Sequence, residues 1–297
     1  MIQHEYVDVD GLRLHCATAG QGKTMLFLHG FPEFWYLWRH QLAEFSRDHR
    51  VVAPDLRGYN LSDKPGPVDA YAMRHLVGVV RGLLDQYADG DTAILVGHDW
   101  GGAVAWAFAL AHPEVLERLV IVNAPHPAIF LRELATNDDQ RKASAYMHFY
   151  RRDDAEQRLS LNGFQPMLNI VVDGSANPGA YSDEDRAAYL ECWSRPGSLT
   201  GGLNYYRAAP AGPPRDEVEG AATRALLEQM LESRPYTVSV PTLVIWGMRD
   251  TALLPGNLEG LEEYVPDLTI RRIDDASHWV INEQPGTVNA AIREFLA

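Results

Sequence analysis

Residues 94–104 form the segment that restricts the fold of this chain most. The segment begins with the apolar run 94–96, continues with the glycine-flanked turn 97–101, whose central residue is Asp99, and ends in a helical pattern rich in small residues. A strand that turns so sharply into a helix needs neighbours without side chains, so that the chain can turn and the helix can pack closely. The segment therefore predicts a strand–turn–helix corner of an α/β protein.

Short β-branched runs alternate with helical patterns over the first 125 residues, which predicts a mostly parallel sheet with crossover helices. The expected strands are residues 24–28, 50–54, 93–96, 119–122, 241–246 and 268–273. A helix is expected at 285–296, whereas residues 128–232 are charged and helical in pattern, with hardly any apolar strand run. We therefore predict an α/β core at residues 1–127 and 233–297, interrupted by an all-helical lid at residues 128–232.

Charge and hydropathy narrow the expected partners and location. With 26 Lys and Arg against 40 Asp and Glu, the net charge of −14 repels nucleic acid and anionic membranes. A neutral or apolar small molecule is the expected partner. The acidic start of the chain does not resemble a signal peptide, and the apolar stretch 103–111 is about half the length of a membrane span. We therefore expect a cytoplasmic protein with no membrane contact.

Cysteine and histidine spacing predicts neither disulfides nor metal binding. Cys16 and Cys192 are too few for a disulfide framework and are expected as free thiols. No cluster of His, Cys and Asp has the spacing of metal ligands. We expect no metal and no cofactor.

Asp99 occupies the place of the nucleophile in the pattern Gly-x-nucleophile-x-Gly. The helix that follows would help to keep its carboxylate ionised through backbone N–H groups and the helix dipole. The simpler interpretation, that Asp99 is only a helix N-cap, stays open on the turn alone. A carboxylate nucleophile attacks a saturated carbon to give an alkyl ester, which points to epoxides or alkyl halides as substrates.

Hydrolysis of such an ester needs a base for water, a partner for the base and an oxyanion hole. His278 follows the last expected strand and Asp250 the strand before it, at the carboxyl ends where open α/β sheets place their sites. Taken alone, His278 could be a structural histidine and Asp250 a turn former, but the order nucleophile, acid, histidine is typical of α/β hydrolases. The backbone N–H groups of Phe31 and Trp100 are the expected oxyanion hole.

Six motifs together resemble the soluble and microsomal-type epoxide hydrolases, a branch of the α/β-hydrolase superfamily. They are HGFPEFW at 29–35, DLRGY at 55–59, GHDWGG at 97–102, GLNYYR at 202–207, WGMRD at 246–250 and SHW at 277–279. They run nearly the full length of the chain. The resemblance implies two lid tyrosines that donate hydrogen bonds to the epoxide oxygen and protonate it as the ring opens.

Tyr206 matches one of these tyrosines, and the other is Tyr146 or Tyr150. Tyr146 fits the family's spacing to the following acidic turn better. Because the two lie four residues apart on an expected helix at 143–150, both are expected on one face, Tyr150 as a packing residue of the substrate pocket. A phenol of pKa about 10 can protonate an alkoxide without ionising at neutral pH.

The apolar side chains near these motifs predict the substrate. Trp35 and Trp279, together with Tyr150, are the expected substrate-binding residues of a hydrophobic pocket. The expected partners are therefore a small apolar epoxide and water. Lid surfaces of such enzymes can pair, which leaves a homodimer open.

Two alternatives to an epoxide hydrolase share the same core motifs. Haloalkane dehalogenases usually carry Asn in the place of Phe31, haloacetate dehalogenases tend to carry Arg in the place of Trp100, and a departing halide needs no proton from a tyrosine. A non-catalytic binding protein could also keep the fold. The intact set of Asp99, Asp250 and His278 argues against that second alternative.

Overall fold

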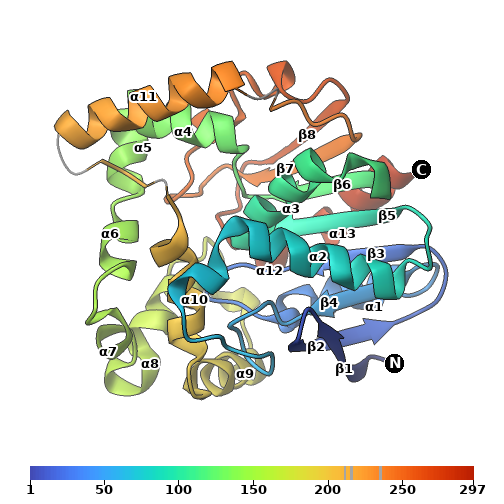
Figure 1. Cartoon of the computed structure of the whole chain (residues 1–297). Coiled ribbons are helices and arrows are strands. Elements are labelled where there is room, and N and C mark those ends of the chain that lie inside the picture. Colours follow the sequence, from blue (N-terminus) through green and yellow to red (C-terminus); the bar gives the residue numbers. More distant parts are fainter. Residues whose placement is uncertain (211, 215–216, 234–235) are drawn as a thin grey trace.

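One sheet of eight strands forms the centre of the protein (Figure 1). The computed structural model describes residues 1–210, 212–214, 217–233 and 236–297. The strands are β1 (Gln3–Val9), β2 (Leu12–Ala19), β3 (Thr24–Leu28), β4 (Arg50–Pro54), β5 (Ala93–His98), β6 (Leu116–Val122), β7 (Thr242–Gly247) and β8 (Leu268–Ile273). Their order in space is β1-β2-β4-β3-β5-β6-β7-β8, and the strands from β4 to β8 are parallel to one another. The predicted mostly parallel sheet is confirmed.

The central parallel strands β3, β5 and β7 are largely apolar because helices cover both faces of the sheet. Every residue of β3, β5 and β7 is buried. Three of the predicted strands have the predicted bounds, and the other three differ by a few residues at their ends.

The antiparallel hairpin of β1 and β2 has no counterpart among the predicted strands. Most of β1 is exposed and polar, so it lacks the apolar pattern of a buried strand. Its sequence signal is the pair Asp10-Gly11, whose φ angles of 51° and 76° suit a two-residue hairpin turn.

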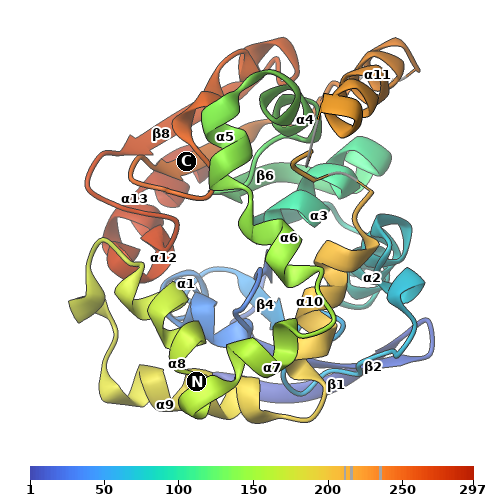
Figure 2. The same ribbon diagram turned by 90° about the vertical axis from the view of Figure 1, so that its left-hand side faces the viewer.

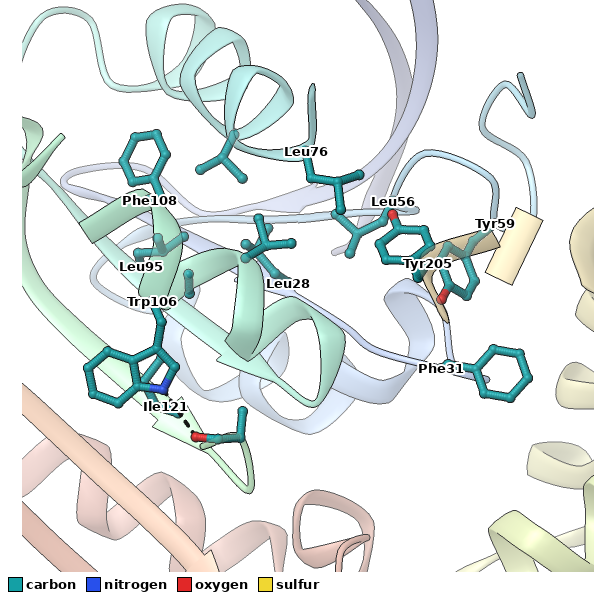
Figure 3. Packing of buried hydrophobic residues seen from close by; sticks show 14 of the residues in the cluster. Leu28, Phe31, Leu56, Tyr59, Leu76, Leu95, Trp106, Phe108, Ile121 and Tyr205 are labelled. Atoms are coloured by element: carbon teal, nitrogen blue, oxygen red, sulfur yellow. Dashed lines mark hydrogen bonds between the residues drawn. The ribbon is translucent and has the colours of Figure 1, made fainter. Parts of the chain in front are cut away.

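Helices of the core lie on both faces of the sheet. These are α1 (Arg39–Phe45), α2 (Met73–Tyr87), α3 (Trp100–Ala111), α12 (Val280–Glu283) and α13 (Pro285–Leu296), with the short helices η1 (Trp35–Trp38), η2 (Val68–Tyr71), η3 (Pro113–Val115), η6 (Pro255–Leu258) and η7 (Leu261–Glu263). On the α2 and α3 face, Leu28 and Leu95 of the sheet pack with Leu76 and Phe108 of the helices (Figure 3). The helices α1 and α13 pack against the opposite face.

A helical insertion lies between β6 and β7, and the described residues there contain no strand. Its helices are α4 (Pro127–Thr136), α5 (Asp138–Ala143), α6 (Tyr146–Tyr150), α7 (Ala155–Leu159), α8 (Leu161–Leu168), the π-helical turn η4 (Asn169–Asp173), η5 (Pro178–Ala180), α9 (Asp183–Ser194), α10 (Ser198–Ala208) and α11 (Glu217–Ser233). In Figure 2, α6 and α10 run beside each other in front of the core. The boundaries of the insertion at residues 128 and 232 stay a prediction.

The insertion is bonded to the loops that follow the central strands. The Trp193 ring N–H donates to the carbonyl of Pro32 at 2.7 Å, and the Tyr205 hydroxyl donates to the carbonyl of Arg57 at 2.9 Å. Pro32 follows β3 and Arg57 follows β4, so this part of the insertion forms a cap over the carboxyl ends of the parallel strands.

The predicted lid helix at 143–150 is wrong in one respect, because two helices share this segment. Helix α5 ends at Ala143, and α6 begins at Tyr146. Between them the backbone tightens to i→i−3 hydrogen bonds, as from the Ala145 N–H to the carbonyl of Lys142. Tyr146 and Tyr150 still share one short helix.

Two further predictions concern membrane spans and thiols. Within the described ranges, no helix is long and apolar enough to cross a membrane. Cys16 and Cys192 are both buried and free, as predicted.

Candidate active site

Asp99 lies at a sharp corner between β5 and α3, with φ 50° and ψ −122°. A Cβ atom on Gly97 would lie 2.5 Å from the carbonyl oxygen of Gly101, and a Cβ on Gly101 would lie 2.2 Å from that of Leu28. Such distances exclude a side chain at either glycine. The two glycines therefore allow the backbone to hold Asp99 in an unfavourable conformation.

The turn after β3 contacts the Asp99 carboxylate directly. The Phe31 N–H donates to Asp99 Oδ1 at 2.7 Å, and a Cβ on Gly30 would lie 2.2 Å from the same oxygen. Burial raises the pKa of Asp99, while His278 and the backbone N–H groups of Trp100 and Phe31 act in the opposite direction. The two N–H groups predicted as an oxyanion hole thus both act on the Asp99 carboxyl group, and the Phe31 N–H bonds its Oδ1.

His29 holds this turn in shape. Its Nδ1 lies 2.9 Å from the carbonyl oxygen of Gly30, and its Nε2 accepts the Leu56 N–H at 2.9 Å. Burial lowers the pKa of His29 to about 4, so the ring is neutral at pH 7, with one donor and one acceptor nitrogen.

His278 lies between two carboxylates. Its Nδ1 is 2.7 Å from Asp250 Oδ2, and its Nε2 is 3.7 Å from Asp99 Oδ2. The N–H groups of Ala252 and Leu253 donate to the other Asp250 oxygen at 2.8 and 2.9 Å. The structure therefore brings the predicted nucleophile, acid and histidine together in one chain of contacts.

The two carboxylates set the charge of His278. Burial disfavours the imidazolium, but the neighbouring charges of Asp250 and Asp99 outweigh it and raise the pKa of His278 to about 9. At neutral pH the resting site therefore holds a protonated His278 between the carboxyl groups of Asp250 and Asp99.

Asn123 supports Asp250 and was not singled out by any motif. Its Nδ2 donates to Asp250 Oδ2 at 2.8 Å, and its Oδ1 accepts the Gly247 N–H at 2.9 Å. Asn123 directly follows β6 with φ 40°, at the register of Asp99 after β5. An Asn just after a central parallel strand is the signal that could have identified it.

Three tyrosines of the cap gather above this chain of contacts. The Tyr206 ring lies 4.9 Å from Tyr150, 6.1 Å from Tyr146 and 5.1 Å from Trp100, measured between ring centroids. Phe31 packs edge-on against Tyr206 at 5.6 Å. Burial and the nearby Asp99 charge raise the pKa of Tyr146 and Tyr206, so both phenols keep their protons at neutral pH.

Two cavities meet at Asp99. The larger, of about 670 Å³, is lined mainly by apolar residues of α3, α4 and the cap, and the smaller, of about 290 Å³, lies toward His278. Asp99, Tyr146 and Tyr206 line both cavities, whereas Tyr150 lines only the smaller one. Tyr146 and Tyr206 therefore stand at the junction, where a reacting group next to Asp99 would lie.

Two tryptophans predicted to bind substrate occupy different places. Trp279 lines the smaller cavity. Trp35 lines neither of the two cavities. Its ring packs against His4 at 4.9 Å between centroids, and its backbone N–H donates to the Asp55 carboxylate. The geometry gives Trp35 a packing position outside the site, because the chain turns into η1 after Phe34 and carries the ring toward β1.

Nothing in the described ranges resembles a metal centre, since no group of three or more His, Cys, Asp or Glu residues there is arranged to hold a metal ion.

Comparisons with known proteins agree with this geometry. The family model for the α/β-hydrolase fold matches residues 23–285. The AB hydrolase superfamily protein YfhM of Bacillus subtilis is 36% identical to this chain, and the alignment covers 99% of this chain and 98% of YfhM. Epoxide hydrolase 4 of Mus musculus is 35% identical over 99% of this chain and 79% of its own length.

Solved structures of epoxide hydrolases are similar to this chain over nearly its whole length. The Bacillus megaterium enzyme in complex with an inhibitor is 36% identical, with a TM-score of 0.88 over 98% of this chain and 99% of that one. Potato epoxide hydrolase I is 27% identical, with a TM-score of 0.82 over 100% of this chain and 99% of that one. The chain belongs to the α/β-hydrolase fold family and, within that family, to the epoxide hydrolases.

The effect of the Asp99 charge on the site should be measurable as a change in the pKa of His278. In Asp99→Asn the pKa of His278 should fall by about one pH unit or more, because an attractive negative charge is removed from beside the imidazolium. Titration of the His278 ring nitrogens by NMR measures this, with the exposed Asp267→Asn as the control. An unchanged or higher pKa in Asp99→Asn would contradict the assigned pairing.

Proposed function

We propose that this hydrolase opens a small apolar epoxide to a vicinal diol through a covalent ester on Asp99. The observation that carries the proposal is the junction of the two cavities, where the Asp99 carboxylate and the Tyr146 and Tyr206 side chains line the same space. An epoxide needs a nucleophile at carbon and a proton donor at oxygen, and these three residues supply both.

The first step forms the ester. Asp99 Oδ1 is held by the Phe31 N–H, which leaves Oδ2 to attack an epoxide carbon. The carbon–oxygen bond of the ring breaks, and its electrons go to the epoxide oxygen. Tyr146 and Tyr206 donate hydrogen bonds to that oxygen, and one of them transfers its proton. This step needs no general base.

The second step hydrolyses the ester. Ester formation removes the negative charge of Asp99, which is one of the charges that raise the pKa of His278. The tyrosinate left by the first step takes the proton of His278, whose pKa falls once the Asp99 charge is gone. Neutral His278 then takes a proton from a water molecule, whose oxygen attacks the ester carbonyl. The negative charge of the tetrahedral intermediate develops on Oδ1, which accepts the Phe31 N–H, and the Trp100 N–H is a second backbone donor to the same carboxyl group. The bond between the carboxyl carbon and Oδ2 then breaks, and the imidazolium protonates the departing diol oxygen. Asp250 stabilises the imidazolium that forms.

The lining of the cavities favours an apolar substrate. The larger cavity presents side chains such as Met73, Leu110, Phe130 and Leu131, which suit an alkyl or aryl substituent of the epoxide. Three of the four relatives named above are epoxide hydrolases by name, which supports the same substrate class.

A dehalogenase activity fits the geometry less well. Halide departure is assisted by N–H donors beside the leaving atom, whereas the Phe31 N–H donates to Asp99 Oδ1 and the Trp100 N–H also bonds the Asp99 carboxyl group. The two phenols that line the junction are acids that a departing halide does not need.

Product analysis with two substrates tests the proposal. Incubation with styrene oxide should give the diol, and incubation with a bromoalkane should release no bromide. Bromide release without diol would support the dehalogenase. Inactivity toward both substrates would support a binding protein that keeps the fold.

Tyr146 and Tyr150 provide a matched pair of variants for the second proton donor. Tyr146→Phe should slow ester formation about tenfold or more, because a proton donor at the epoxide oxygen is lost. Tyr150→Phe should slow it much less, since Tyr150 lines only the smaller cavity. Rapid-quench measurement of ester formation compares them. A larger loss in Tyr150→Phe would reverse the assignment.

A further inference from the structure

Glu283, at the end of α12, is a buried carboxylate that the mechanism above does not use. Its Oε1 accepts hydrogen bonds from the Ser175 hydroxyl, the Ala176 N–H and the Ser277 hydroxyl, each at 2.6 Å. Its Oε2 accepts the Ser277 N–H at 2.7 Å. Four donors thus meet on one side chain.

These bonds join two segments that are more than 100 residues apart in the chain. Ser277 directly precedes His278 in the loop after β8. Ser175 and Ala176 lie in the cap, just after η4 and next to Gly174, which lines the smaller cavity together with His278. Glu283 therefore fastens the histidine loop to the cap at the edge of that cavity.

The donor set suits an ionised carboxylate. An ionised Glu accepts hydrogen bonds only, and all four groups here are donors. Hydrogen bonds to a charged oxygen are short and about twice as strong as neutral ones, which agrees with distances of 2.6 and 2.7 Å. Ser277, which directly precedes His278, is thus held by strong hydrogen bonds from both its hydroxyl and its backbone N–H.

We propose that Glu283 is a positioning residue for ester hydrolysis, which it promotes by fixing the loop that carries His278 and by tying that loop to the cap. The proposal rests on the function proposed above. Ester formation uses Asp99 and the tyrosines and needs no base, whereas hydrolysis needs His278 Nε2 at a defined distance from water and ester. A displaced His278 therefore slows the second step and leaves the first step largely intact.

Two other residues also hold His278, and their contacts differ from those of Glu283. Asp250 binds Nδ1, and His98 Nε2 lies 2.9 Å from the carbonyl oxygen of His278. Both contacts lie on His278 itself. Glu283 fixes the residue before it, so that the backbone is held on its N-terminal side as well.

Glu283→Gln removes part of this support without changing the size of the side chain. The two backbone donors, of Ala176 and Ser277, bond to different carboxylate oxygens. A glutamine has one oxygen and one NH₂ group, so in either orientation one backbone N–H faces another donor. One of the two segments must therefore move away.

Single-turnover kinetics with styrene oxide test the proposal, with ester and diol quantified by rapid quench. In Glu283→Gln the ratio of the hydrolysis rate to the ester-formation rate should fall about tenfold or more, as small displacements of a catalytic group cost up to about a hundredfold. Glu262→Gln, the same substitution at an exposed residue of η7, should keep the wild-type ratio. At saturating substrate, a loss of folded enzyme alone would lower the amplitudes of both phases and leave the two rate constants, and so their ratio, unchanged.

Each outcome decides between the claims. Wild-type enzyme that forms no diol would refute the proposed function itself. Diol formation by the wild type with an unchanged ratio in Glu283→Gln would refute the role of Glu283. If Glu283→Gln does not fold, Ser175→Ala takes its place, since it removes one bond to Oε1 and should lower the ratio in the same direction by a smaller factor. An unchanged ratio there would equally refute the role.

Discussion

The hydrogen bond from the Phe31 N–H to Asp99 Oδ1 is the interaction on which the rest of the site depends. It requires β3 and β5 to be neighbours in the sheet, with Leu28 opposite Gly97. It also requires glycines at positions where a Cβ would meet backbone or carboxylate atoms. With Oδ1 held in this way, Oδ2 is left to face His278. In the proposed mechanism, this contact makes Oδ2 the attacking oxygen and Oδ1 the oxygen that later carries the negative charge.

The second constraint is the balance of charge around His278. Two carboxylates flank one imidazole in a buried site, and their attraction exceeds the cost of burying the cation. Alkylation of Asp99 would cancel one of these charges. In the proposed mechanism, ester formation therefore lowers the pKa of His278, so that its neutral form becomes available as the base for the second step.

Polar side chains tie the cap to the loops that carry Asp250 and His278. Gln140 of α5 donates to the carbonyl of Ala252 at 2.8 Å and accepts the Leu254 N–H at 2.9 Å, just beyond Asp250. Glu283 makes the corresponding link for His278. These two links thus fix the position of the cap, which carries the tyrosines, relative to the loops that carry Asp250 and His278.

Much of this arrangement could be predicted from local sequence. The corner at Asp99 and the parallel strands follow from apolar runs and glycine spacing, which are short-range signals. The β1–β2 hairpin was missed because β1 is polar and exposed, and the break before Tyr146 because tight i→i−3 bonds leave no pattern in hydrophobicity. Trp35 ends the motif at 29–35, but its ring packs against His4 and not in the site. Asn123 could have been identified by its place after a central parallel strand, whereas Gln140 and Glu283 act through contacts between distant segments, which one sequence does not contain.

The position of an oxygen label tests the central claim, nucleophilic attack by Asp99, most directly. One turnover with styrene oxide in heavy-oxygen water should place the label in the Asp99 carboxylate and none in the diol, because the diol takes its second oxygen from Oδ2. Mass spectrometry of the diol and of the peptide that contains Asp99 measures both. Label in the first diol with none in Asp99 would mean direct attack by water and would contradict the account.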